Sequence, residues 1–479
     1  MSHHAGLASF KHVHIIGVCG TLMGSFAAFL KRSGIRVTGS DQNVYPPMSD
    51  VLRSAGVELF SPYGAETLDK IQGRPDLVVV GNVISRGNPE MAAFMERGDP
   101  YVSLPEFMEK HLLSSTRNLV VAGTHGKTTT SSILAHVLSK SGRAPSYFIG
   151  GVSHTLPNSF QVETDSPYFV LEGDEYDTAF WDKVPKFNHY LPDDVILTSV
   201  EFDHADIYAD LDAVKKAFVG LLARIRKGGR LIACIETENV RGLIEESKVP
   251  VLTYSRFERD HADYTFRNLK NSQDGIEFDV FFRNQHKDSL RLKLSGEHNA
   301  LNALSVYIEC VSLGLSSKEI TEGLASFEGV KRRQEERGEV GGVLVIDDFA
   351  HHPTAVRETL KALHQKYPKR RLLTVFEPRS ATSRRKVFQN EYTEAFGDAD
   401  ASFIAVAYDQ SKIPTDQQFS SQELVEGLRK RNRTASFFES VDEGVKQVAN
   451  FSQSGDVIAV LSNGGFGGFI PKLLSALQK

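Results

Sequence analysis

The stretch NLVVAGTHGKTTTSSILAHVLSKSG, residues 118–142, decides the fold of the middle of this chain. It begins with an apolar run that predicts a buried strand, and it ends with apolar residues at helical spacing. Between the two stands GTHGKTT, residues 123–129, with glycines, a lysine and threonines. A strand, a glycine-rich loop and a helix in this order predict a phosphate-binding loop in an α/β domain.

The chemistry of this loop favours a nucleoside triphosphate. Glycines let backbone N–H groups point into one concavity, the helix N-terminus adds partial positive charge, and Lys127 adds a full charge. The hydroxyl of Thr128 is placed to ligate Mg²⁺. The full motif has glycine where this chain has Val121, so a solvated glycine-rich turn is the alternative. The residues predicted to bind ATP here are Gly123, Thr124, His125, Gly126, Lys127, Thr128 and Thr129.

The alternation of strands and helices continues on both sides of this loop. Upstream lie HVHIIGV, a helix predicted over 23–32, IRVTGSD and DLVVVGNVI; downstream, after the linker GVKRRQEERGEVGG, come VLVIDDF, LLTVFEP, FIAVAY and DVIAVLS. Such alternation predicts parallel sheets covered by helices. We therefore predict an α/β protein with three domains, residues 1–112, 113–328 and 329–479.

Composition agrees with this organisation and excludes several classes of protein. A chain of 479 residues is long enough for about three domains, and 41% hydrophobic with 24% charged residues is ordinary for a globular protein. The chain has 55 Lys and Arg and 60 Asp and Glu, which gives a net charge of −5. It therefore lacks the excess of basic residues that would predict a nucleic-acid partner. No apolar run reaches the length of a membrane span, and no secretory signal is visible. We expect a cytoplasmic protein without membrane partners.

A second glycine-rich turn, GVCGTLMG at residues 17–24, also lies between a predicted strand and a predicted helix. Its spacing differs from the dinucleotide fingerprint, which has glycines at positions one, three and six. Asp41 ends the next strand and is placed to accept a ribose hydroxyl. The pattern indicates a nucleotide diphosphate at a helix N-terminus without identifying the nucleotide, and a turn needed only for packing is the alternative.

Carboxylates and a histidine follow two further strands of the middle domain. FVLEGDE, residues 169–175, carries Glu172, and the predicted strand 195–200 is followed by EFDHAD, which sets His204 between two aspartates. The carboxyl ends of parallel strands meet at the edge where the phosphate loop opens. Carboxylate oxygens there suit Mg²⁺, so Glu172 is a predicted ligand and His204 a candidate functional residue.

Two later segments complete the set of candidates. SGEHNALN, residues 295–302, opens a helix whose polar residues could contact a base or ribose, with capping as the alternative. Arg332 and Arg333 in the second linker are sited to reach a phosphate, or form an exposed basic turn. In the last domain, DDFAHHP and EPRS end predicted strands, where ligands bind in such sheets.

With these segments assembled, the chain resembles the Mur ligases, ATP-dependent amide-forming enzymes of peptidoglycan synthesis. GTHGKTTT, the strand with Glu172, EFDHAD, GEHNALNAL, the paired arginines and DDFAHHPTAV follow the order of that family, whose phosphate loop also lacks the first glycine. The resemblance implies an N-terminal Rossmann-like UDP-binding domain, a central P-loop ATPase domain and a C-terminal Rossmann-like domain.

Within the family, the segments GVCGTLMGSFAA, SDQNVYPPMS, LEGDEYDTAFWDK, FEPRSATSRR and SNGGFGG resemble one recycling branch. That branch joins UDP-N-acetylmuramate to the tripeptide L-alanyl-γ-D-glutamyl-meso-diaminopimelate, through an acyl phosphate made with ATP and Mg²⁺. The histidine in the phosphate loop and the DDxxHHPT segment are also similar to the branch that adds L-alanine to UDP-N-acetylmuramate, which stays the alternative.

The resemblance also assigns roles to residues. The implied catalytic residues are Lys127, Glu172 and His204. The implied metal ligands are Thr128, Glu172 and His204. Beyond the phosphate loop, ATP would contact His298, Asn299, Asn302, Arg332, Arg333, Asp347 and His351. The UDP-sugar would contact Gly17, Gly20, Thr21, Met23, Gly24, Asp41 and Ser85. The resemblance places the amine substrate in the third domain without identifying its residues there, and we select Arg379, Ser380 and Asn463 as candidates.

Other classes fit fewer of these features. A folylpolyglutamate-type ligase leaves the first domain without a purpose. A nicotinamide-dependent dehydrogenase explains the first glycine turn but leaves the phosphate loop unused. A regulatory NTPase module that binds without ligation leaves the acidic strand ends and the third domain unexplained.

Overall fold

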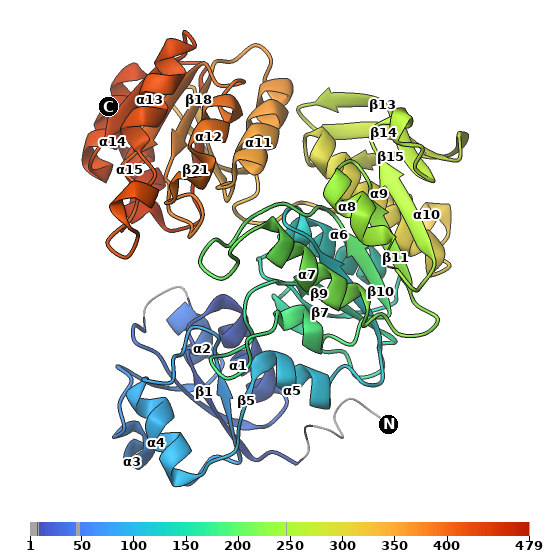
Figure 1. Cartoon of the computed structure of the whole chain (residues 1–479), viewed down its shortest axis with the longest axis vertical. Coiled ribbons are helices and arrows are strands. Elements are labelled where there is room, and N and C mark those ends of the chain that lie inside the picture. The colour runs from blue at the N-terminus through green and yellow to red at the C-terminus, as the bar shows by residue number, and fades with distance from the viewer. Residues whose placement is uncertain (1–6, 8, 45–47, 246, 479) are drawn as a thin grey trace. The chain divides into compact units, whose positions relative to one another are not determined.

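The computed structural model describes residues 7, 9–44, 48–245 and 247–478 (Figure 1). Part of the segment SDQNVYPPMS, residues 45–47, lies outside the described residues. The chain divides into two compact units, one of residues 1–200, 212–264 and 305–323 and the other of residues 201–211, 265–304 and 324–479. In the part of the chain that the structure describes, no helix has both the length and the apolarity that crossing a membrane requires.

The first unit begins with a parallel sheet in the order β3-β2-β1-β4-β5. Its strands are β1 (His12–Ile16), β2 (Arg36–Ser40), β3 (Glu58–Phe60), β4 (Leu77–Val80) and β5 (Tyr101–Ser103). The helices that alternate with them are α1 (Thr21–Arg32), α2 (Met48–Ser54), α3 (Thr67–Lys70), α4 (Pro89–Arg97) and α5 (Leu104–His111). The predicted helix over 23–32 therefore begins two residues earlier, at Thr21.

The middle of the first unit is a second sheet, with strands in the order β12-β11-β10-β6-β9-β7-β8. The strands are β6 (Arg117–Ala122), β7 (Ser146–Phe148), β8 (Phe160–Gln161), β9 (Tyr168–Gly173), β10 (Asp194–Leu197), β11 (Arg230–Cys234) and β12 (Val251–Ser255). Its helices are α6 (Lys127–Lys140), α7 (Leu211–Leu222) and α8 (Glu238–Ile244), with the 3-10 turn η2 (Lys186–His189). β6 is flanked by β9 and β10, both parallel to it, so the phosphate loop leaves the centre of the sheet.

The strand predicted over 195–200 is shorter than expected. β10 ends at Leu197, and the chain then turns to bond the phosphate loop. The carbonyl of Ser199 accepts the Thr124 N–H at 2.9 Å, and its hydroxyl oxygen accepts the His125 N–H at 3.0 Å. His204 consequently lies in a loop seven residues beyond the strand rather than at its end.

The second unit contains an antiparallel hairpin and a six-stranded sheet. β14 (Gly275–Phe282) pairs with β15 (Gln285–Leu292), and β13 (Tyr264–Ser272), α9 (Glu297–Ser312) and α10 (Ser317–Ser326) lie nearby in sequence. The sheet order is β16-β17-β21-β18-β19-β20, with β16 antiparallel and the rest parallel. Its strands are β16 (Glu335–Val340), β17 (Val343–Asp348), β18 (Leu372–Phe376), β19 (Ala401–Ala405), β20 (Thr434–Phe438) and β21 (Val457–Leu461). Its helices are α11 (Pro353–Lys366), α12 (Gln389–Ala395), α13 (Ser421–Lys430), α14 (Val441–Phe451) and α15 (Phe469–Ala476).

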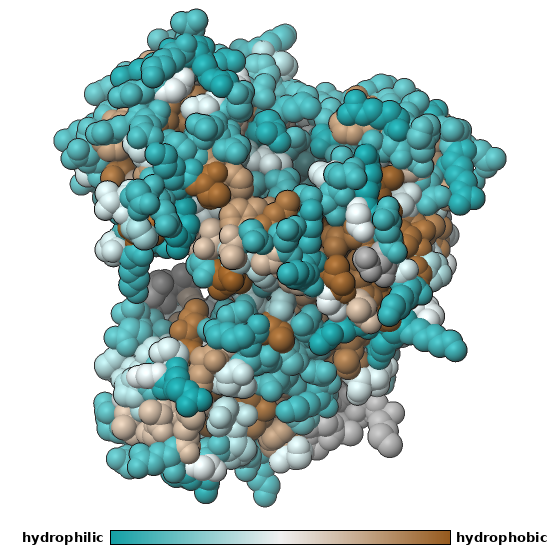
Figure 2. Space-filling model, in the orientation of Figure 1, coloured by the Kyte–Doolittle hydropathy of each residue, from teal (hydrophilic) through white to brown (hydrophobic). Residues whose placement is uncertain are grey.

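Both faces of this last sheet are buried, as expected for a parallel sheet between helices. Leu344 and Ile346 of β17 point into one apolar cluster, and Val343 and Val345 point into another. On the face of the molecule in Figure 2, hydrophilic side chains predominate and hydrophobic side chains occur in small groups. The apolar strands read from the sequence are therefore mainly core strands.

Candidate active site

The phosphate loop leaves the carboxyl end of β6 and wraps the start of α6. Gly123 has a φ of 134°, and a side chain there would meet the backbone of Ser199 at 2.8 Å, so glycine is required. Gly126, with a φ of 82°, precedes the first residue of α6. Val121, where the full motif has glycine, lies inside β6 between Ile196 and Glu172 and is fully buried. The loop is shortened because this position belongs to the sheet.

Lys127 lies folded over the loop that carries it. Its Nζ donates to the Gly123 carbonyl at 2.6 Å and lies 2.9 Å from a carboxylate oxygen of Glu175. Burial lowers the pKa of Lys127, but the nearby carboxylates, Glu175 foremost, together raise it above its ordinary value. The lysine therefore keeps its positive charge although its side chain is only 14% exposed.

Thr128 and Glu172 meet at the same edge of the sheet. The Thr128 hydroxyl donates to Glu172 Oε1 at 2.7 Å, and Glu172 Oε2 accepts the Gly150 N–H at 2.6 Å. A hydroxyl and a carboxylate at one point are oxygen ligands of the kind that Mg²⁺ prefers. The structure thus brings together two of the three predicted metal ligands, whereas His204 belongs to the other compact unit.

The first domain's glycine turn also lies between a strand and a helix, but Gly20 before α1 is extended where Gly126 before α6 is left-handed, and fewer charges lie around it. Gly17 has a φ of 84° and donates to the Ser40 carbonyl at 2.8 Å, and the Asp41 carboxylate accepts the Cys19 N–H at 2.9 Å. Gly20 precedes α1. A side chain at Gly24 would clash with the Met48 side chain of α2, so close packing of the two helices favours glycine there.

The remaining residues predicted for the UDP-sugar lie around this turn. Thr21 opens α1 and is exposed, whereas the Met23 side chain is buried in the domain. Ser85 is exposed in the segment after β4, where its carbonyl accepts the Asn88 N–H at 3.1 Å. The turn thus offers backbone groups, one hydroxyl and one carboxylate to a ligand.

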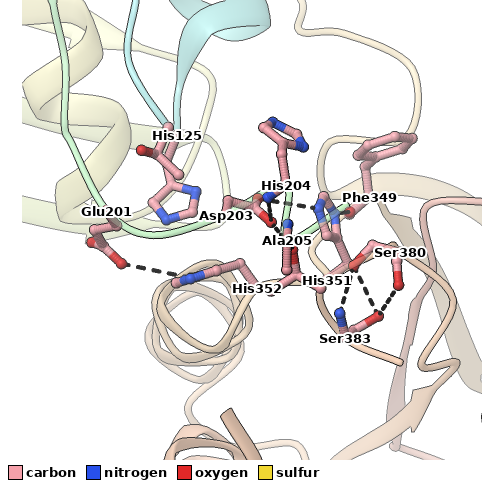
Figure 3. Close-up of polar contacts among 12 residues, drawn as sticks. His125, Glu201, Asp203, His204, Ala205, Phe349, His351, His352, Ser380 and Ser383 are labelled. Atoms are coloured by element: carbon pink, nitrogen blue, oxygen red, sulfur yellow. Dashed lines mark hydrogen bonds and ion pairs between the residues drawn. The ribbon is translucent and has the colours of Figure 1, made fainter. Parts of the chain in front are cut away.

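In the second unit, Asp203 of the EFDHAD segment is held from several directions (Figure 3). Its Oδ1 accepts the Thr382 hydroxyl at 2.5 Å and the His204 N–H at 2.7 Å, and its Oδ2 lies 3.8 Å from His351 Nε2. Burial raises the pKa of Asp203, but the histidines, His351 foremost, depress it well below its ordinary range. The His204 and His351 segments are therefore joined through one ionised carboxylate.

The paired arginines turn toward their own domain. The Arg332 guanidinium donates to the carbonyls of Ser462 at 2.5 Å and Gly464 at 2.7 Å and lies 3.5 Å from Asp347. Arg333 lies over the Phe349 ring, 4.9 Å from its centroid. Burial raises the pKa of Asp347 despite Arg332. In this structure Arg332 binds carbonyls of its own domain, and its contact with a phosphate stays a prediction.

The three polar residues at the start of α9 lie together. Asn299 donates to the Ser295 carbonyl at 2.8 Å, and Asn302 donates to Asn299 Oδ1 at 3.2 Å. His298 Nε2 lies 3.5 Å from the Gln334 amide nitrogen. Asn299 thus donates to a carbonyl just before its helix, which is not the bond of a helix N-cap, whose side-chain oxygen accepts an N–H.

The three residues assigned to the amine substrate are placed differently from one another. Arg379 stacks on Tyr408, 3.8 Å from the ring centroid. Ser380 is buried; its hydroxyl donates to Ser383 Oγ at 2.9 Å and accepts the Ser383 N–H at 2.9 Å. Asn463 has a buried Oδ1 without a hydrogen-bond partner among the described residues. Asn463 is therefore the one of the three with an acceptor left for a ligand.

Comparison with known proteins decides the family. Models described as Mur ligase family, catalytic domain, as Mur ligase middle domain and as Mur ligase, glutamate ligase domain match residues 12–116, 121–309 and 332–464. The UDP-N-acetylmuramate–L-alanyl-γ-D-glutamyl-meso-2,6-diaminoheptandioate ligase of Escherichia coli (strain K12) is 38% identical over 471 residues, covering 98% of this chain and 98% of that protein. The chain belongs to the Mur ligase family.

Two other Mur ligases are similar to this chain over most of its length. The crystal structure of a murein peptide ligase from Psychrobacter arcticus superposes with a TM-score of 0.72 at 34% identity, over 98% of this chain and 99% of that chain. A UDP-N-acetylmuramate–L-alanine ligase from Desulfosudis oleivorans is 32% identical over 454 residues, 95% of each protein. The predicted family and the predicted three-domain α/β fold are confirmed.

Sequence reasoning missed several residues of this Mur ligase's candidate site. Glu175 stood in the acidic segment after β9 without a role, although it holds Lys127. Thr382, which lies 2.5 Å from Asp203 across 179 residues of sequence, belongs to the segment FEPRSATSRR but was given no role. Lys186, which pairs with Asp174, also lies outside every motif. Only the likeness of LEGDEYDTAFWDK to one branch pointed near it.

Proposed function

We propose that this protein is an ATP-dependent ligase that joins UDP-N-acetylmuramate to L-alanyl-γ-D-glutamyl-meso-diaminopimelate, a step of peptidoglycan recycling. The observation that carries the proposal is the 38% identity, along nearly the whole chain, to a ligase named for this reaction. Lys127 and Thr128 each pair with a carboxylate at one edge of the sheet, which supports a nucleotide site at the phosphate loop.

The reaction requires an activated carboxyl group, because a carboxylate is a poor electrophile. An oxygen of the lactyl carboxylate attacks the γ-phosphorus of ATP, the bond to the β-phosphate oxygen breaks, and ADP leaves. The peptide amine then attacks the acyl carbon of the resulting acyl phosphate, inorganic phosphate leaves and the amine loses a proton. Each step brings anions together, so the site must supply positive charge.

The phosphate loop fits the cations that ATP needs. Lys127 keeps its charge and sits over the loop, where it would bind the phosphates once it leaves Glu175. Thr128 and Glu172 would hold Mg²⁺, which would offset phosphate charge during the transfer. His204 as a further ligand, and the contacts of ATP with the α9 segment and the paired arginines, remain predictions.

The division of labour among the domains is part of the proposal. Residues 1–112 would bind the UDP-sugar through the turn at Gly17 and through Asp41, residues 113–328 would bind ATP, and residues 329–479 would bind the amine. Asn463, with its buried acceptor, is the best placed of the amine residues. A cytoplasmic location, where ATP is available, also remains a prediction.

L-alanine addition is the second candidate, because a ligase named for it is 32% identical over 95% of the chain. An amine competition assay separates the two. We expect ADP release to require ATP, Mg²⁺, UDP-N-acetylmuramate and an amine together, with the tripeptide giving the larger kcat/KM. Equal or better turnover with L-alanine would contradict the tripeptide assignment.

A further inference from the structure

A short hairpin, residues 176–186, leaves the acidic end of β9 and returns to η2. The N–H of Lys186 donates to the Tyr176 carbonyl at 3.0 Å, and the N–H of Thr178 donates to the Val184 carbonyl at 2.9 Å. At the tip, Ala179 and Asp182 exchange backbone bonds of 3.0 and 3.2 Å. The hairpin is therefore a defined element rather than an irregular loop.

The tip of this hairpin packs on the first domain. Phe180 and Trp181 lie against the apolar cluster that includes Ile84 and Phe94. The Trp181 ring meets Tyr101 edge-on, with centroids 4.9 Å apart, and Arg86 lies 6.0 Å from the Phe180 ring centroid. The hairpin thus connects the domain assigned to the UDP-sugar with the ATP-binding edge.

The base of the hairpin carries a second shielded lysine. Lys186 Nζ lies 2.6 Å from Asp174 Oδ2, with the lysine side chain 14% exposed. Asp174 directly precedes Glu175, the residue that pairs with Lys127. Two lysines therefore converge on one acidic strand end, and ATP phosphates account for only one of them.

The same hairpin offers a contrasting pair. Lys183 lies 2.8 Å from Asp177, but the Lys183 side chain is 66% exposed. Exposed pairs of this kind contribute little, because water and salt screen them. A shielded pair costs desolvation of both charges and is weak evidence for a stabilising role, so the position of Lys186 calls for another explanation.

We propose that Lys186 binds the sugar-nucleotide carboxylate that is to be phosphorylated. This inference rests on the proposed function, in which that carboxylate must approach a triphosphate to which Lys127 is already bound. A separate cation is needed to bring it there, and Lys186 stands between the hairpin tip on the first domain and the carboxylates beside the phosphate loop. In the structure the Asp174 carboxylate pairs with the Lys186 ammonium group, as a substrate carboxylate would.

The first test compares Lys186→Met with Lys183→Met. Calorimetry measures UDP-N-acetylmuramate binding with a non-hydrolysable ATP analogue, and ADP release measures turnover. We expect Lys186→Met to weaken sugar-nucleotide binding and raise its KM by about 10- to 100-fold, the cost of losing a charged hydrogen bond, with the KM for ATP changed less than about twofold. Lys183→Met should match the wild type, and Lys186→Arg should restore binding to within a few fold.

A double variant separates substrate binding from simple neutralisation of Asp174. If Lys186 only balances that aspartate, Asp174→Asn combined with Lys186→Met removes the unpaired charge and restores binding, which would overturn the inference. Persistent weak binding in the folded double variant supports it. Lys186→Met that behaves like Lys183→Met would also overturn it.

The proposed function fails separately. A wild-type protein that binds the sugar nucleotide without releasing ADP contradicts the ligase reaction, while the binding comparison still decides the role of Lys186. A wild-type protein that binds no UDP-N-acetylmuramate contradicts both.

Discussion

The two glycine turns of the first unit lie in equivalent places, between a strand and a helix, but they differ in backbone conformation and in chemistry. Each follows a buried central strand and precedes a helix, and among the described residues neither α1 nor α6 has a side-chain hydrogen bond capping its start. Both therefore leave backbone N–H groups to an anion. The turn at Gly123 adds Lys127 and Thr128, each paired with a carboxylate, whereas the turn at Gly17 adds the Thr21 hydroxyl and the Asp41 carboxylate.

The difference teaches that glycine spacing sets the shape of a phosphate site and the following side chains set its charge. A triphosphate with Mg²⁺ needs a lysine, a hydroxyl and carboxylates within reach. A diphosphate bound without transfer of a phosphoryl group needs mainly backbone donors and one group for the ribose. Substitutions in one turn should therefore affect one substrate and leave the other.

Replacing the lysine should have the largest effect. Lys127→Ala removes the charged group of the phosphate loop, so we expect ADP release to fall by about 10²- to 10³-fold or more. Calorimetric binding of UDP-N-acetylmuramate should stay measurable and close to wild type. Near-normal turnover would contradict the phosphate-loop assignment, and loss of both activities would show that the two turns are not independent.

Replacing the carboxylate beside Thr128 should have an intermediate effect. Glu172→Gln keeps the size of the side chain but weakens an oxygen ligand, so the Mg²⁺ concentration for half-maximal ADP release should rise by about 10-fold or more. A Mg²⁺ titration of the variant and the wild type measures this shift. An unchanged titration curve would remove Glu172 from the metal site, and Thr128→Ser, which keeps the hydroxyl, serves as the matched control.

The smallest effect is expected in the first domain. Asp41→Asn retains an oxygen that can accept the Cys19 N–H but loses the charge offered to a ribose hydroxyl. We expect the KM for UDP-N-acetylmuramate to rise by about 10-fold while the KM for ATP is unchanged. Steady-state kinetics with each substrate varied in turn measures both values. A larger change for ATP than for the sugar nucleotide would invert the comparison.

The sequence predicts well what is local and poorly what is distant. The phosphate loop was readable because its strand, glycines, lysine and helix are contiguous, and Thr128 meets Glu172 because β6 and β9 are neighbours. The pairing of Thr382 with Asp203 joins residues 179 apart and has no pattern. The carbonyls that hold Arg332 lie 130 and 132 residues away, so its orientation was also beyond sequence reasoning.

The shortened strand β10 shows the same limit at closer range. The segment VILTSV, residues 195–200, predicted a strand through Val200, but the ladder ends at Leu197 because Ser199 bonds the phosphate loop instead. A segment that bonds a functional loop can have the same residue pattern as a strand, so the sequence does not distinguish the two. The position of His204, set by that early end, could not be predicted.

The hairpin tip gives this protein a built-in optical probe. Trp181 is the single tryptophan of the chain, and it sits partly buried against Tyr101 and Phe180, with ring centroids 4.9 and 4.7 Å away. The emission spectrum excited at the red edge of indole absorption therefore comes from one contact between the hairpin and the first domain. The wavelength of the Trp181 emission reports whether water reaches that contact, without any label attached.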